Sequence, residues 1–298
     1  MSTLDEILMQ LETSEIMILV AVFFIINTSM VFIGMLIDLL KQLFSRKSKS
    51  GDKRNWKDTA ANTSIFMFTQ FLESTVFGII AIVCLYPIYH WNPIEIPTTA
   101  LTWVLSLVLA DLTYYWMHRI EHEHRILWAN HSVHHSSQDY NLSVSFRLSV
   151  IEGAFEWIFL IPMILLGFDL FQAMVSLIFV VQYQAWIHTE NIGKLGWLDK
   201  VFNTPSVHRV HHGSNPQYID KNYGGVLMLW DHLFGTYQKE EEKVIYGLTK
   251  NIDTNNPITI NFREYIKIIK DVYQCRNYRD RFKIIFGGLV WRPSYFEK

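Results

Sequence analysis

Long apolar segments dominate the first two thirds of the chain. A helix needs roughly 20 residues to cross about 30 Å of hydrocarbon, and three apolar runs reach this length, at residues 16–37, 65–88 and 98–117. A further apolar stretch at 150–187 is broken by the triplet GFD at 167–169, so we expect a membrane hairpin with arms of marginal length. The pattern predicts an all-α integral membrane protein with three to four transmembrane helices and this hairpin.

The composition agrees with a bilayer environment. Of the 298 residues, 50% are hydrophobic, 15% are aromatic and only 18% are charged, below the quarter or so that is typical of soluble proteins. The formal net charge of −2 gives no basic field for nucleic acid. The two cysteines, Cys84 and Cys275, indicate neither a disulfide framework nor a cysteine-based metal site. Acidic residues precede the first apolar run, which favours a retained anchor over a cleaved signal peptide.

The distribution of basic residues predicts the orientation. Residues 41–57 contain seven Lys or Arg and one acid, whereas the N-terminus and the connector at 89–97 contain no Lys or Arg. The positive-inside rule therefore places 41–57 in the cytoplasm and the N-terminus outside. The third run then returns to the cytoplasm at Met117, and the hairpin brings His188 back to the same side. We expect a cytoplasmic helical cap there.

Nine of the twelve histidines form motifs that fall on this predicted side. Helical spacing of three or four residues places side chains on one face, about 5–6 Å apart at Cβ, where two imidazoles can bind one metal ion. One H-x-x-H-H motif alone would be weak evidence, but here two copies accompany an H-x-x-x-H motif. The candidate ligands are His118, His122, His131, His134, His135, His188, His208, His211 and His212.

Nine ligands exceed the four to six positions of a single ion, so the sequence predicts two metal ions. A structural zinc site would be closed with four ligands and would usually contain cysteine. Imidazole suits iron, copper and zinc alike, so the ligand type alone leaves the metal open.

The order of these motifs between apolar runs resembles the fatty acid hydroxylase/sterol desaturase superfamily of membrane di-iron oxygenases. The strings DYNLS (139–143) and NPQYIDKNYGG (215–225) resemble its alkylglycerol monooxygenase branch and the bacterial relatives of that branch. The likeness covers residues 97–250. It departs from some members at Gln184, where they carry an additional ligand.

The resemblance implies two Fe ions, O₂ activation and hydroxylation of an alkyl carbon of a membrane lipid. In the alkylglycerol branch this carbon adjoins the ether oxygen, and the product decays to a fatty aldehyde and glycerol. A tetrahydropterin such as tetrahydrobiopterin supplies the electrons there. For this chain the lipid stays open, and so does the choice between a pterin and a redox protein as electron donor.

Two acidic residues near the first motif are further candidates. The resemblance implies a functional role for Glu123, as a water or pterin contact or as a partner of a histidine; the alternative is a solvated carboxylate beside arginines. Asp111 lies in the third run, seven residues before His118, on the same helical face. Ionisable groups within a membrane span are costly, so we expect Asp111 to support the site. Gly224 and Gly225 indicate a turn with positive φ.

The leading hypothesis is a membrane-bound non-haem di-iron monooxygenase. A sterol or fatty acyl desaturase or hydroxylase of the same superfamily is the alternative enzyme. A metal transporter or sensor is disfavoured, because transporters place ligands near the bilayer midplane. We treat 1–298 as one domain with a catalytic core at about 97–250 and a basic amphipathic tail at 251–298 that suits a membrane surface. The predicted location is a bacterial inner membrane or the endoplasmic reticulum, with the active site on the cytoplasmic face.

Overall fold

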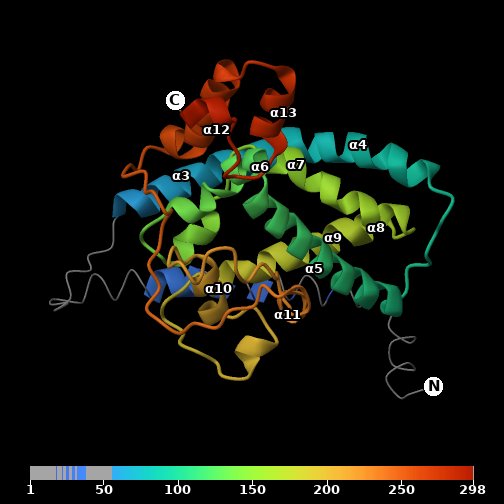
Figure 1. The fold of residues 1–298 in the computed structure, drawn as a ribbon. Coiled ribbons are helices and arrows are strands. Elements are labelled where there is room, and N and C mark those ends of the chain that lie inside the picture. The colour runs from blue at the N-terminus through green and yellow to red at the C-terminus, as the bar shows by residue number, and fades with distance from the viewer. Residues whose placement is uncertain are drawn as a thin grey trace.

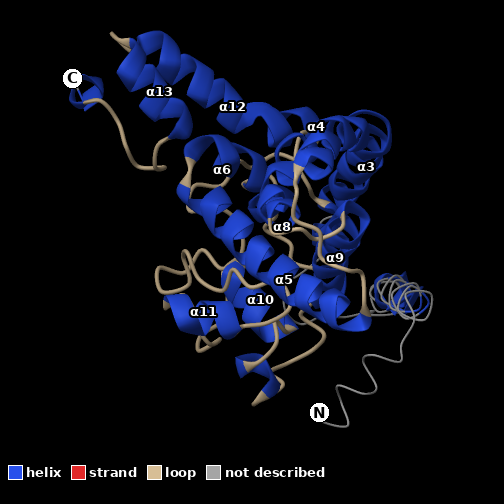
Figure 2. Cartoon of the chain, turned by 90° about the vertical axis from the view of Figure 1, so that its right-hand side faces the viewer, coloured by secondary structure: helices blue, strands red, loops and turns tan. Residues whose placement is uncertain are grey.

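The computed structural model describes residues 56–297 continuously, and residues 18, 22, 25, 26, 29, 30 and 32–37 before them. The described part is helical and contains no β-strand (Figure 2), in agreement with the all-α prediction. Most of the basic loop that predicts the orientation lies outside the described residues. The α-helices are α3 (Trp56–Leu72), α4 (Gly78–Trp91), α5 (Ala100–Glu123), α6 (Arg125–His131), α7 (Gly153–Glu156), α8 (Ile161–Leu165), α9 (Leu170–Tyr183), α10 (Pro205–His211), α11 (Leu229–Phe234), α12 (Pro257–Gln274) and α13 (Tyr278–Phe286).

Within the described residues, three helical segments are long and apolar enough to cross a membrane: Trp56–Trp91, Ala100–Glu123 and Leu170–Ile187. The first joins α3 and α4 through one π-helical turn and is a single rod in Figure 1. Only 6% of its most apolar window is buried, and side chains such as Met67 and Val83 point outward. A soluble protein would not expose such a surface, so the protein is an integral membrane protein. The predicted span at 16–37 is described only in part.

The hairpin breaks where the sequence predicts. α8 ends at Leu165, Gly167 adopts φ +97°, and the Asp169 carboxylate accepts a hydrogen bond from the Gln172 amide at 3.0 Å to begin α9. The arms are not equivalent, because only the second, Leu170–Ile187, is long enough to cross a membrane. With 18 residues this arm is at the lower end of the length that spans a membrane, so the marginal length of the arms stays a prediction.

The core of the bundle lies between α5 and α9, which cross in Figure 1. Ser106 and Ser176 face each other in this contact, with their hydroxyls 2.7 Å apart. The buried small residues Ala110 and Ala173 contribute to the same core. Small side chains let two membrane helices approach closely and join through side-chain hydrogen bonds. This packing fixes the position of α5, which carries the first histidine motif.

The C-terminal pair α12 and α13 packs on the rest of the fold and covers α6 (Figure 1). The Arg263 guanidinium donates to the carbonyl of Ser132 at 3.1 Å. The Arg125 amide donates to the carbonyl of Gly287 at 3.0 Å. The C-terminal helices thus bond to α6 and to Ser132, which directly follows His131, and so support the second histidine motif.

Candidate metal centre

α5 places the first two histidines. A capping box between Thr99 and Thr102 begins the helix, and the extended backbone of His124 ends it. The helix therefore continues beyond the apolar run, and His118 and His122 lie on its last two turns. Both side chains are almost fully buried. The predicted helical spacing is correct for this motif.

The second and third motifs use shorter elements. His131 is the last residue of α6, and His134 and His135 lie on the 3₁₀ turn that follows. His208 and His211 lie on α10, and His212 directly follows it. The seven-residue α10 begins at Pro205, where proline is favoured in a first helical turn.

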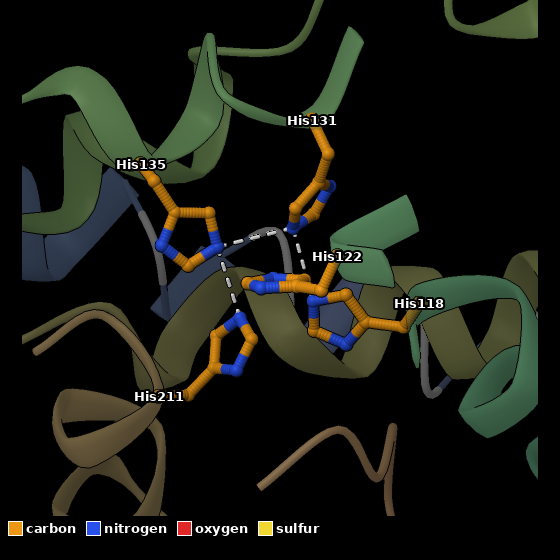
Figure 3. A group of neighbouring side chains, drawn as sticks. All are labelled: His118, His122, His131, His135 and His211. Carbon is orange, nitrogen blue, oxygen red and sulfur yellow. Dashed lines mark hydrogen bonds between the residues drawn. The ribbon is translucent and has the colours of Figure 1, made fainter. Parts of the chain in front are cut away.

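The nine candidate histidines converge in two groups, and within each group all ligand atoms lie within 4.8 Å of one another. Figure 3 shows the rings of the first group turned toward a common centre. All nine are buried. The five-histidine group contains His118, His122, His131, His135 and His211, and the four-histidine group contains His134, His188, His208 and His212.

The division follows a simple rule of spacing. Each pair of histidines four residues apart shares a group, whether it comes from α5, from the α6 turn or from α10. The extra histidine of each H-x-x-H-H motif, His134 or His211, belongs to the other group. Each of these two motifs therefore contributes ligands to both groups. The rings of His135, in the first group, and His212, in the second, stack with their centroids 4.5 Å apart.

Hydrogen bonds at the outer edge of the rings fix their protonation. The Nδ1 atoms of His118, His188 and His211 lie 2.8–3.0 Å from backbone carbonyl oxygens. A carbonyl oxygen only accepts, so each Nδ1 carries the proton and each Nε2 of a neutral ring presents a lone pair. Neighbouring Nε2 atoms nevertheless lie only 2.9–3.2 Å apart.

A metal ion explains this arrangement. The Nε2 lone pairs of His118, His188 and His211 point toward neighbouring ring nitrogens, where a metal ion can bind them. With metal–imidazole bonds of about 2.0–2.1 Å, adjacent nitrogens of an octahedral ion lie about 3.0 Å apart. Burial also lowers the pKa of His188 to about 4 and of His211 to about 3, which keeps these rings neutral and able to bind metal. The residues therefore fit two metal ions.

Comparisons with known proteins agree with this site. Residues 103–236, which contain all nine histidines, match the family model for fatty acid hydroxylase. This segment is similar to fatty acid hydroxylase domains. The predicted resemblance to the fatty acid hydroxylase/sterol desaturase superfamily is confirmed. No solved structure matches the chain.

The relatives of the matched segment act on lipids. Alkylglycerol monooxygenase of Homo sapiens is 47% identical over 193 residues, which cover 65% of this chain and 43% of the relative. The Xenopus tropicalis enzyme of the same name is 43% identical over 70% of this chain and 47% of its own length. Ornithine lipid hydroxylase OlsE of Rhizobium tropici is 34% identical over 50% of this chain and 45% of its own length. The chain spans about half the length of these relatives.

Asp111 supports the matched segment without touching a histidine of either group. Its buried carboxylate accepts from the amides of Val226 and Leu227 at 2.7 and 3.1 Å, and from the indole of Trp230 at 2.9 Å. The same loop carries the Tyr223 carbonyl that holds His118. Asp111 therefore fixes the loop that orients a candidate ligand.

The NYGG turn is built differently from the expectation. Positive φ occurs at Asn222, at 59°, and not at Gly224 or Gly225. The neighbouring residues leave no room for a side chain at these glycines, because a Cβ at Gly225 would lie 2.3 Å from a methyl group of Val180. The prediction of positive φ at these glycines is wrong, because close packing explains them.

Glu123 lies at the edge of the site. Its carboxylate is half exposed and accepts from the Arg119 guanidinium at 2.8 Å. Arg125 instead pairs with Asp271 on the tail. The three histidines that the motifs leave out, His90, His124 and His232, are absent from both groups, as expected.

Several supporting residues escaped the sequence analysis, and Arg147 is the clearest. Its buried guanidinium donates to the Val133 carbonyl at 3.1 Å and to the Ser136 hydroxyl at 3.0 Å, on either side of His134 and His135. It also pairs with Asp58 of α3 at 2.8 Å. No pattern in the sequence connects residue 58 with residue 147, so only the fold reveals this contact.

A cavity of about 580 Å³ adjoins the histidines. His131, His134 and His188 form part of its wall, and most of its surface is apolar. Its other walls come from residues 32–35, α3, α5, the segment at 145–156 and α9. Met67 and Val181 of this lining are also exposed on the outer surface of membrane helices, so the cavity reaches from the candidate centre toward the surface that faces lipid.

Proposed function

We propose that the protein is a di-iron, O₂-dependent monooxygenase that hydroxylates an alkyl carbon of a membrane lipid, with the ether-adjacent carbon of alkylglycerols as the target. The observation that supports this most is the meeting of two histidine groups with a largely apolar cavity. Imidazole ligands suit iron, and the similar alkylglycerol monooxygenases suggest the substrate. The centre would lie at the cytoplasmic face.

The side chains of the cavity would hold the alkyl chain. Met117, Phe146 and Leu148 offer apolar contacts, and a chain that enters from the bilayer keeps its hydrocarbon away from water. The two irons, when bound to the nine histidines, would supply the oxidising chemistry. Exclusion of water at the buried histidines protects a reactive oxidant from side reactions.

The overall reaction balances with two electrons and two protons. An alkyl ether R′CH₂OR, O₂, two electrons and two protons give the hemiacetal R′CH(OH)OR and water. The hemiacetal then breaks the bond between its carbon and the ether oxygen, and the hydroxyl proton passes to that oxygen, which yields the aldehyde R′CHO and the alcohol ROH. A tetrahydropterin or a redox protein would supply the electrons.

We propose that the donor meets the surface near Glu123. Asp220 is exposed nearby, with a carboxylate oxygen 3.6 Å from Nδ1 of the buried ligand candidate His122. Asp220 thus lies between the buried five-histidine group and the solvent. Glu123, paired with Arg119, offers hydrogen-bonding groups to a pterin ring.

The test is a reconstituted assay with the full chain. Iron-loaded protein in nanodiscs receives alkylglycerol, a sterol, a fatty acyl lipid or an ornithine lipid, with a tetrahydropterin or with a ferredoxin and its reductase. We expect fatty aldehyde from alkylglycerol, and none from the His134→Ala variant. A hydroxyl or a double bond on another lipid would reject the ether target, and no product from any lipid in iron-loaded protein would reject the monooxygenase itself.

A further inference from the structure

The outer nitrogens of the five-histidine group meet two kinds of partner. Nδ1 of His118 and of His211 donates to a backbone carbonyl. Nδ1 of His131 instead lies 3.2 Å from a carboxylate oxygen of Glu121, as an ion-pair contact, and this nitrogen makes no hydrogen bond within the described chain.

Glu121 is unusual because it is buried. Its side chain is 4% exposed, whereas Asp220, the carboxylate beside His122, is 59% exposed. The carboxylate of Glu152 is also buried and lies within 4.8 Å of Glu121 and His131. Electrostatic interactions are much stronger away from water. A buried carboxylate therefore acts on the neighbouring imidazole far more strongly than an exposed one.

The position of Glu121 follows from the helix. It lies three residues after His118 on α5, so both side chains point to the same side, toward α6. Among the described residues, no ion pair or hydrogen bond joins Glu121 to the four-histidine group, where Nδ1 of His188 bonds to the Gln184 carbonyl. Its influence is thus confined to one group.

We propose that Glu121 is a positioning residue that orients His131, increases its electron donation and strengthens metal binding selectively at the five-histidine group. The proposal rests on the metals of the proposed function. Carboxylate partners of this kind fix the ring and the tautomer of a ligand, and their loss typically weakens metal binding about 10–100-fold. Glu121 also lines the lipid cavity, beside His131.

The test measures metal binding rather than turnover. Full-length protein in detergent is stripped with a chelator and titrated with Co²⁺, whose visible spectrum reports coordination. Metal per chain is counted by mass spectrometry after dialysis. We expect two ions in the wild type. In Glu121→Ala one ion binds about 10–100-fold more weakly while the other keeps its affinity. Glu121→Gln retains a hydrogen-bond acceptor without the charge. Its affinity for the first of these ions should lie between those of the wild type and Glu121→Ala.

A matched control separates positioning from folding. Glu156→Gln changes a carboxylate of the same cavity that belongs to neither histidine group, and this variant should bind both ions as the wild type does. Unchanged affinity at both sites in Glu121→Ala would overturn the proposal, as would equal weakening of both sites with a lower melting temperature of the metal-free protein. If the wild type binds two ions and oxidises no lipid, the proposed function fails while the role of Glu121 stands.

Discussion

The Nε2 atoms of His188 and His208 lie 2.9 Å apart, although Nδ1 of His188 already donates its proton to the Gln184 carbonyl. The Nε2 of His188 therefore presents a lone pair toward a second nitrogen at close range. Similar contacts repeat through both histidine groups. A metal ion would be bound by several of these nitrogens at once, so metal binding and stability should be coupled.

Removal of the metals should lower the melting temperature of the protein. A ligand at 100 times its Kd stabilises the folded state by about 2.7 kcal/mol, which corresponds to a shift of roughly 5–10 °C at this chain length. Thermal unfolding before and after chelation measures the shift, and Fe²⁺ should restore the midpoint. The His208→Ala variant should respond more weakly than His124→Ala, since His124 lies outside both groups. Equal midpoints with and without metal would contradict the coupling.

The buried pair of Asp58 and Arg147 should be essential for the second histidine motif. Asp58→Asn leaves the Arg147 guanidinium without its charge partner in a buried position, which costs about 3–5 kcal/mol. We expect a large drop in the melting temperature and a loss of metal from both groups. The exposed pair Lys239 and Glu241 is a suitable control, because Glu241→Gln should change stability by less than about 0.5 kcal/mol. Similar effects of the two changes would be inconsistent with the structure.

Gly225 should not tolerate a side chain. In Gly225→Ala the new methyl group would meet Val180 at 2.3 Å and the Asp111 carboxylate at 3.0 Å, and overpacking of this kind costs about 1–3 kcal/mol. At Gly193 no atom lies within 4 Å of an added Cβ, so Gly193→Ala should leave the melting temperature nearly unchanged. Thermal unfolding of the two variants checks the difference. A stable Gly225→Ala protein would mean that the loop after α10 packs more loosely than described.

The cavity should select the length of the alkyl chain. Ala185 lines it beside His188, and Ala185→Leu fills part of the space. One methylene group more or less in an apolar pocket changes specificity about 10–200-fold. We therefore expect kcat/KM to fall for long alkyl chains and to be retained for short ones, with unchanged metal content. Ala185→Gly should show the opposite preference, and parallel losses for all chain lengths would place the substrate elsewhere.

The C-terminal helices should lie on an anionic membrane surface. Exposed apolar side chains form a stripe on each helix, between exposed basic residues. A stripe of this kind with flanking positive charge is typical of interfacial helices. The stripes contain Ile258, Phe262, Ile266, Ile269 and Tyr273 on α12, and Tyr278, Phe282 and Phe286 on α13.

Photo-cross-linking can test this contact in nanodiscs that contain anionic lipid. Benzoylphenylalanine at position 273 should form lipid adducts that mass spectrometry detects. The same group at position 267, on the opposite face of α12, should form few. Equal adduct yields at the two positions would show that the tail does not rest on the membrane by its apolar stripe.

Much of the architecture could be predicted from local patterns. The apolar runs indicated helices that suit a membrane, and the GFD triplet marked the end of α8. The spacing of histidines identified the nine residues that the structure brings together, because helical periodicity places residues four apart on one face. These features depend on short stretches of chain.

Features that join distant segments were not predictable. The five-to-four division requires the relative positions of α5, the α6 turn and α10. The Arg147 contact joins residues 89 positions apart, and the role of Asp111 appears only when the loop at 226–230 lies beside α5. Glu121 could have been predicted, because it lies three residues after His118 on the same helix. The resemblance instead directed the prediction to the neighbouring Glu123.

Isotope incorporation tests the central claim most directly. Iron-loaded protein in nanodiscs is given alkylglycerol and a tetrahydropterin under ¹⁸O₂, and the aldehyde is reduced at once to the alcohol to prevent exchange with water. We expect one ¹⁸O atom in the fatty alcohol from the wild type and no product from His134→Ala. Fatty alcohol that carries only oxygen from water, from protein that contains two irons, would contradict a monooxygenase at the histidine centre.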